Sequence, residues 1–175
     1  MAESAFFTAL QEQIGHEFSA HQQYVAIATY YDTLTMPRMA ALFYEQAVEE
    51  REHAMMMVQY LLDTDEQVVI PALPAPKMDF ADIVEPVQLA LDQEKRVTAQ
   101  INELTRLARE ANDYASDQFM QWFIKEQVEE VAKMSSLLTV AKRNTDSIAD
   151  LEAYVAGQQA NGGGVDPTAP SIADA

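Results

Sequence analysis

Four stretches of the chain repeat hydrophobic residues every three or four positions, the spacing that places side chains on one face of an α-helix. Each stripe is apolar at both ends and is interrupted near its middle by an acidic residue. The four interruptions are Glu17, Glu50, Glu94 and Glu130. A carboxylate withdrawn from water must be paired, protonated or bound to a cation. The shared interruption therefore predicts four helices that surround one cation site.

The same pattern sets the expected helix boundaries. We expect long helices over residues 4–33, 37–62, 82–109 and 113–143, and a shorter fifth helix over 146–156. Pro86 narrows the start of the third helix to Glu85 or Pro86. Residues 63–79 contain three prolines, which a helix interior does not tolerate, and are long enough to travel the length of a bundle. The sequence therefore predicts an all-α four-helix bundle with one long crossover and a short fifth helix.

The end of the chain differs in composition from the rest. Residues 157–175 contain three consecutive glycines, two prolines and few apolar side chains. Such a segment has little surface to bury and is typical of a mobile end. We therefore expect one domain over residues 1–156, followed by a flexible C-terminal tail over 157–175.

Composition narrows the partners and the compartment. The 175 residues include 28 acids and 11 bases, a formal net charge of −17. This excess of acids argues against a nucleic-acid partner and favours cations, although simple solubility explains the charge equally well. The absence of cysteine excludes disulfides and thiolate metal sites, and is compatible with the reducing cytoplasm, where we expect the protein. No apolar run reaches about 18 residues, so we expect no membrane partner.

The second stripe carries an acid and a histidine three positions apart. Glu50 and His53 share one helical face at this spacing. A carboxylate together with an imidazole suits a borderline transition metal better than calcium or magnesium. Such a pair most often lies on a solvated surface, but Phe43 and Met57 flank it on the same stripe and favour an interior position. For Glu17 and Glu94 taken singly, a surface position is an equal alternative.

The fourth helix carries a denser group of acids. Gln127 and Glu130 follow the apolar stripe, whereas Glu126 and Glu129 lie one step to the side, as Glu49 does on the second helix. Acids four residues apart repel each other on a helix unless a cation lies between them. The offset acids therefore indicate either a further metal position or a solvated acidic edge.

Several segments together resemble the non-haem bacterial ferritins, most closely those of the actinobacterial type. They are His16-Glu17-Phe18 with Gln23-Tyr24, and residues 44–54, 91–94 and 121–130. The similarity covers about residues 5–155. The resemblance implies that the predicted bundle is ferritin-like. It also implies a hollow cage of 24 identical subunits, which the periodicity of the sequence does not show.

The resemblance further implies a diiron ferroxidase centre. Residues matching its first iron position are Glu17, Glu50 and His53, and those matching its second are Glu50, Glu94 and Glu130, with Glu50 as the bridge. Residues matching a third iron position of the bacterial branch are Glu49, Glu126, Glu129 and Glu130. Gln127 and Tyr24 match residues beside the centre, Gln127 as a metal-binding and catalytic group and Tyr24 as a source of a hydrogen bond or an electron. Ordinary aromatic packing is an equal alternative for Tyr24.

Two positions separate this chain from the bacterioferritins. Arg51 stands where they carry a haem-binding methionine, so we expect no haem, and Lys133 stands where they carry a second histidine. The activity implied by the resemblance is oxidation of Fe(II) by dioxygen or hydrogen peroxide and storage of the product as a ferric oxyhydroxide mineral. Two alternatives remain open: a diiron oxygenase or peroxidase with an organic substrate, and a non-enzymatic helical bundle.

Overall fold

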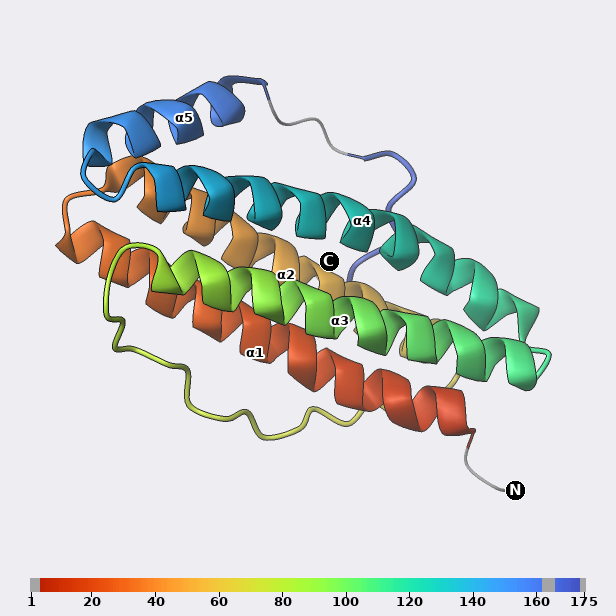
Figure 1. Ribbon diagram of the computed structural model, residues 1–175. Helices are drawn as coiled ribbons and strands as arrows, with labels where there is room; N and C mark the ends of the chain where they lie inside the picture. The colour runs from red at the N-terminus through yellow and green to blue at the C-terminus, as the bar shows by residue number, and fades with distance from the viewer. Residues whose placement is uncertain (1–3, 162–165, 174–175) are drawn as a thin grey trace.

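The computed structural model describes residues 4–161 and 166–173, and the chain is helical over most of that range (Figure 1). Its elements are α1 (Ala5–Thr33), α2 (Pro37–Asp63), α3 (Glu85–Glu110), α4 (Tyr114–Arg143) and α5 (Ile148–Asn161). The four long helices lie side by side, and α5 lies across one end of the bundle, where α2 begins. The predicted all-α four-helix bundle with one long crossover and a short fifth helix is confirmed.

The long crossover makes α2 and α3 parallel by returning the chain along the outside of α1. The side chain of Gln23 donates to the Lys77 carbonyl at 2.9 Å and accepts from the Lys77 N–H at 2.8 Å. Gly15 faces Pro71 so closely that a Cβ at this position would lie 2.5 Å from the ring Cγ. The irregular crossover is therefore held against α1 at two separate points.

The fifth helix differs most from its predicted range of 146–156. It begins at Ile148 and continues through Gly157 to Asn161, five residues beyond the expected end. A glycine inside a helix costs about 1 kcal/mol relative to alanine, which is too little to end a helix that packs well. Leu151 and Val155 are fully buried in the core, and this packing holds α5 on the bundle. The helix therefore extends into the first residues of the predicted tail.

Part of the expected tail lies against α2 and α4. Over residues 166–173, the carboxylate of Asp166 accepts a hydrogen bond from the indole N–H of Trp122 at 3.1 Å, and Ile172 packs against the apolar core. The structure thus gives this segment a defined place. The mobility of the tail stays a prediction, and its residues 162–165 and 174–175 lie outside the described residues.

The interior contains two apolar clusters with a polar layer between them. One cluster includes Tyr24, Phe43 and Met134, and the other includes Ile14, Met57 and Phe123. The buried acids between them are Glu17, Glu50, Glu94 and Glu130. Within the described part of the chain, every helix falls short of the combination of length and apolar character that a membrane span requires. The fold therefore gathers the carboxylates of four helices into one layer inside the protein.

Candidate metal centre

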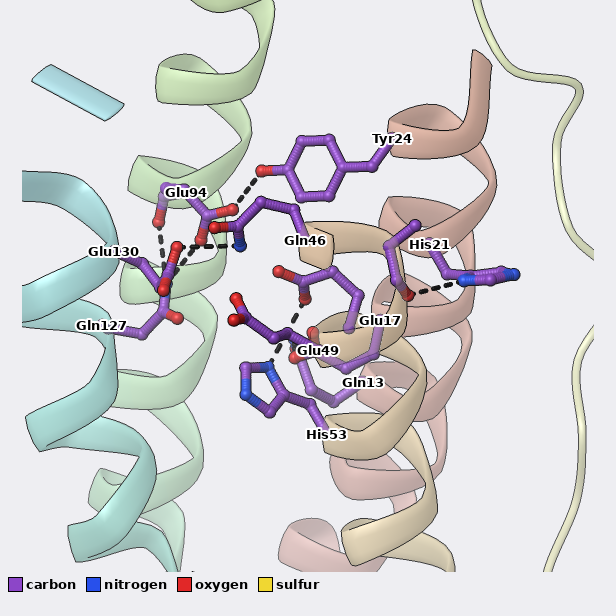
Figure 2. Close-up of polar contacts among 12 residues, drawn as sticks. Gln13, Glu17, His21, Tyr24, Gln46, Glu49, His53, Glu94, Gln127 and Glu130 are labelled. Atoms are coloured by element: carbon purple, nitrogen blue, oxygen red, sulfur yellow. Dashed lines mark hydrogen bonds and ion pairs between the residues drawn. The ribbon is translucent and has the colours of Figure 1, made fainter. Parts of the chain in front are cut away.

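Three of the predicted ligands form a compact buried group. Glu17 comes from the middle of α1, and Glu50 and His53 come from one face of α2. Each offers one ligand atom within 4.8 Å of the other two, and Nδ1 of His53 lies 3.5 Å from Oε2 of Glu50. Two carboxylates and one imidazole suit a transition metal such as iron or zinc. Figure 2 shows Glu17 and His53 pointing into the same interior space.

One oxygen of this group lacks a hydrogen-bond partner. The amide of Gln13 donates to Oε1 of Glu17 at 2.8 Å, whereas Oε2 of Glu17 is buried without a partner. The imidazole of His53 is fixed by edge-on packing against Trp122 and Phe123, with ring centroids 5.5 and 5.9 Å away. A buried carboxylate oxygen without a partner indicates a place for a proton or a cation.

The electrostatics of the group favour either protonation or a bound cation. Burial raises the pKa of Glu17 well above its usual value, and the charge of Glu50 raises it further. Burial also raises the pKa of Glu50, with the charge of Glu94 as the next cause. Because a metal binds the deprotonated form, an incoming cation would replace protons at these carboxylates.

Across the bundle, two more buried carboxylates are held by donors from the protein. Glu94 on α3 accepts a hydrogen bond from the hydroxyl of Tyr24, and the amide of Gln127 donates to Oε2 of Glu94 at 3.2 Å. Glu130 on α4 accepts a bond from the amide of Gln46 at 3.0 Å. Burial raises the pKa of Glu130 to about 7. Figure 2 shows Glu94 and Glu130 facing the group around Glu17, so acids from opposite sides of the bundle line one interior.

The predicted outer acids lie at the edge of this centre and differ in exposure. Glu49 and Glu126 are half-buried, whereas Glu129 is exposed. Burial raises the pKa of Glu126, and the nearby charges of Glu129 and Glu49 add to the increase. The charges of Glu49 and Glu129 therefore both act on the carboxylate of Glu126. Their contact with solvent leaves the solvated-edge interpretation open for Glu129 in particular.

Two glutamines that support the carboxylates were given no role from the sequence. Gln13 holds Glu17, and Gln46 holds Glu130, and both amides are buried. Gln13 and Gln46 lie four residues before Glu17 and Glu50, on the same helical faces as these acids. That spacing in the sequence could have identified both glutamines as hydrogen-bond donors to the buried carboxylates.

His21 shares the stripe of Glu17 but takes no part in the group. Its Nδ1 contacts the carbonyl oxygen of Ala47 at 2.6 Å. Figure 2 shows the ring directed away from the carboxylates. This contact is a structural bond between α1 and α2.

Comparison with known proteins is consistent with this geometry. The sequence matches the family described as "Ferritin-like domain" over residues 7–144. It is 47% identical to "Ferritin BfrB" of Mycolicibacterium smegmatis over 98% of this chain and 94% of that protein. It is 36% identical to "Bacterial non-heme ferritin" of Staphylococcus saprophyticus over 88% of this chain and 92% of that protein. An open pore ferritin from Archaeoglobus fulgidus shares the fold, with a TM-score of 0.85 at 24% identity over 90% of this chain and 97% of that one. The chain therefore belongs to the ferritin family.

Proposed function

We propose that the protein oxidises Fe(II) at a diiron ferroxidase centre and stores the ferric product as an oxyhydroxide mineral inside a hollow cage. The observation that carries this proposal is the buried group of Glu17, Glu50 and His53, which contains a carboxylate oxygen without a partner. Membership in the ferritin family favours iron over other transition metals. In this proposal iron is the substrate and the stored cargo.

Each ligand has a separate role in the proposed centre. Glu17 and His53 hold the first iron, Glu94 and Glu130 hold the second, and Glu50 bridges the two. These carboxylates bind Fe(III) more strongly than Fe(II), because the interaction with anionic ligands grows with the charge of the ion. The ligand set therefore favours oxidation of the bound substrate.

The two positions differ in what an ion must displace. The first position is already compact and has an oxygen without a partner. At the second position, Glu94 accepts hydrogen bonds from Tyr24 and Gln127, so its charge is already partly compensated before iron binds. We therefore propose that the first position fills before the second. Tyr24 and Gln127 then orient Glu94 and assist the reaction.

The reaction requires two ions because each Fe(II) supplies one electron. Two ferrous ions together reduce dioxygen, which takes up two protons and leaves as hydrogen peroxide. They can also reduce hydrogen peroxide, which takes up two protons and leaves as two waters. The buried acids that are protonated in the empty centre release their protons when metal binds.

The outer acids extend the path of the ferric product. Glu49, Glu126 and Glu129, together with Glu130, form the proposed third iron position between the buried pair and the surface of α2 and α4. We further propose that 24 chains assemble into the cage and that the protein acts in the cytoplasm. The absence of cysteine is compatible with that compartment. Because Arg51 stands where bacterioferritins carry a haem-binding methionine, we also propose that the chain binds no haem.

Aerobic addition of Fe(II) at two ions per chain tests the centre. Ferric absorbance should rise in the parent, and Glu50→Ala should slow the initial rate by about tenfold or more, because both positions lose a ligand. Glu12→Ala removes an exposed acid from α1 and serves as the control, with an unchanged rate. Equal rates in Glu50→Ala and the parent would show that the site assignment is wrong.

A further inference from the structure

Lys133 places a positive charge between two of the proposed iron ligands. It lies one helical turn after Glu130 on α4, and its Nζ is 3.6 Å from Oε1 of Glu130. The same Nζ is 3.5 Å from Oε2 of Glu49 on α2. The ammonium group thus joins acids from two helices, as a bound cation would.

The negative charges in the two parts of the centre are therefore compensated differently. The inner part contains Glu17, Glu50 and His53, and the outer part contains Glu49 and Glu130. In the inner part, Glu17 has a buried oxygen without a partner, and His53 lies beside Glu50. In the outer part, Glu49 and Glu130 already share the ammonium of Lys133. A metal ion entering the inner part meets no ammonium at ion-pair distance from Glu17 or Glu50 among the described residues. An ion entering the outer part must compete with a lysine of the same sign.

The structure also provides a place to which this lysine can move. Lys133 is 40% exposed and lines a groove of about 730 Å³ between α2, α4 and α5. Glu45 of α2 and Tyr154 of α5 line the same groove, so a further acid lies along it. The flexible four-carbon stem of a lysine permits its ammonium to swing from the acids into such a space.

We propose that Lys133 is a resident cation that limits how many metal ions the centre holds. It compensates Glu49 and Glu130 while the outer position is empty, and it leaves for the groove when an ion takes that position. The lysine thereby weakens the outer position, whereas Glu17, Glu50 and His53 of the first position lie outside its ion pairs. This inference rests on the proposed function, because it assigns a control to one position of the same centre.

Titration of metal-free protein with Zn²⁺, followed by calorimetry, measures this effect without any redox step. Lys133→Met keeps the apolar stem and removes the charge, so it should bind one further Zn²⁺ per chain, or bind the weakest ion about tenfold more tightly. Lys133→Arg keeps the charge and should resemble the parent. Adding Glu49→Ala to Lys133→Met should abolish the gain, because the outer position then lacks a ligand.

Each other outcome overturns the inference. An unchanged titration for Lys133→Met would show that the ammonium does not compete with metal. An equal gain in Lys133→Arg would show that the charge is not the cause, and a gain that survives Glu49→Ala would place the new ion elsewhere. Glu50→Ala, titrated in parallel, should lose the tightly bound ions of the parent. If it keeps them, the proposed function fails, whatever Lys133 does.

Discussion

Single side chains determine how the charge of the buried acids is compensated in the metal-free centre. Glu17 and Glu50 are each almost fully buried, and burial raises both of their pKa values. Glu130 has a hydrogen bond from Gln46 and the ammonium of Lys133 beside it, yet burial still raises its pKa to about 7. Protons therefore compensate part of the charge that a metal would compensate in the proposed centre.

These raised pKa values predict that the metal-free protein loses stability as the pH rises. Glu130 ionises near pH 4.5 in the unfolded chain and near 7 in the folded one. Between these values the folded state holds more protons, so the free energy of unfolding falls with increasing pH, by at most about 1.4 kcal/mol per pH unit for one group. Glu130→Gln keeps the shape without the titrating proton and should have a smaller slope. Urea unfolding with a chelator at pH 5.5, 6.5 and 7.5 measures both slopes, and parallel slopes would contradict the prediction.

Contacts between elements hold the layer of carboxylates in register. The N-terminus of α2 receives a cap from α5, since the carboxylate of Glu152 accepts the N–H groups of Arg38 and Met39 at 2.9 Å each. The crossover is anchored on α1 by Gln23 and by the close approach of Pro71 to Gly15. These contacts fix where α1 and α2 lie along the bundle axis.

The contact between the crossover and α1 predicts the sign of one substitution. Helix propensity alone would make Gly15→Ala stabilising by about 1 kcal/mol. The new Cβ would lie 2.5 Å from Cγ of the Pro71 ring, so we expect a net loss of about 1–3 kcal/mol instead. Denaturant unfolding of the parent and the variant measures the difference. Pro71→Ala removes the ring atom and should restore part of the loss in the double variant, and a stabilised Gly15→Ala would show that the contact is unimportant.

The whole chain leaves apolar surface uncovered, as expected for one subunit of an assembly. Val69, Ile70 and Met78 of the crossover are each about half exposed. Side chains of this kind favour contact with another protein surface. The proposed cage would cover such surface and enclose the mineral.

The cage predicts both a mass and an iron load. Native mass spectrometry of the metal-free protein should give a closed assembly with 24 times the mass of one chain, since identical subunits favour closed symmetry. Aerobic loading with excess Fe(II) should then leave hundreds of irons with each assembly after gel filtration. Two irons per chain would instead indicate a diiron enzyme with another substrate, and none would indicate a structural bundle.

The sequence alone determined the number of helices and the depth at which the acids lie. An α-helix advances 1.5 Å per residue, so the interruptions at Glu17, Glu50, Glu94 and Glu130 mark a fixed position along each helix. The prolines before α3 settled the topology, because a long irregular segment permits parallel neighbours. The shared face of Glu50 and His53 was predictable from their spacing of three residues, whereas the resemblance to ferritins implied Glu17 as their partner.

Only the tertiary structure decided what compensates each acid. Tyr24 and Glu94 are 70 positions apart, and Gln46 and Glu130 are 84 positions apart, so no local spacing relates them. The sequence showed only that Lys133 stands where bacterioferritins carry a histidine. In the fold, its ammonium lies between Glu49 and Glu130. The place of α5 on the bundle also depends on the burial of Leu151 and Val155. Helical periodicity determines which face a side chain occupies, but the packing of helices determines which partner it meets.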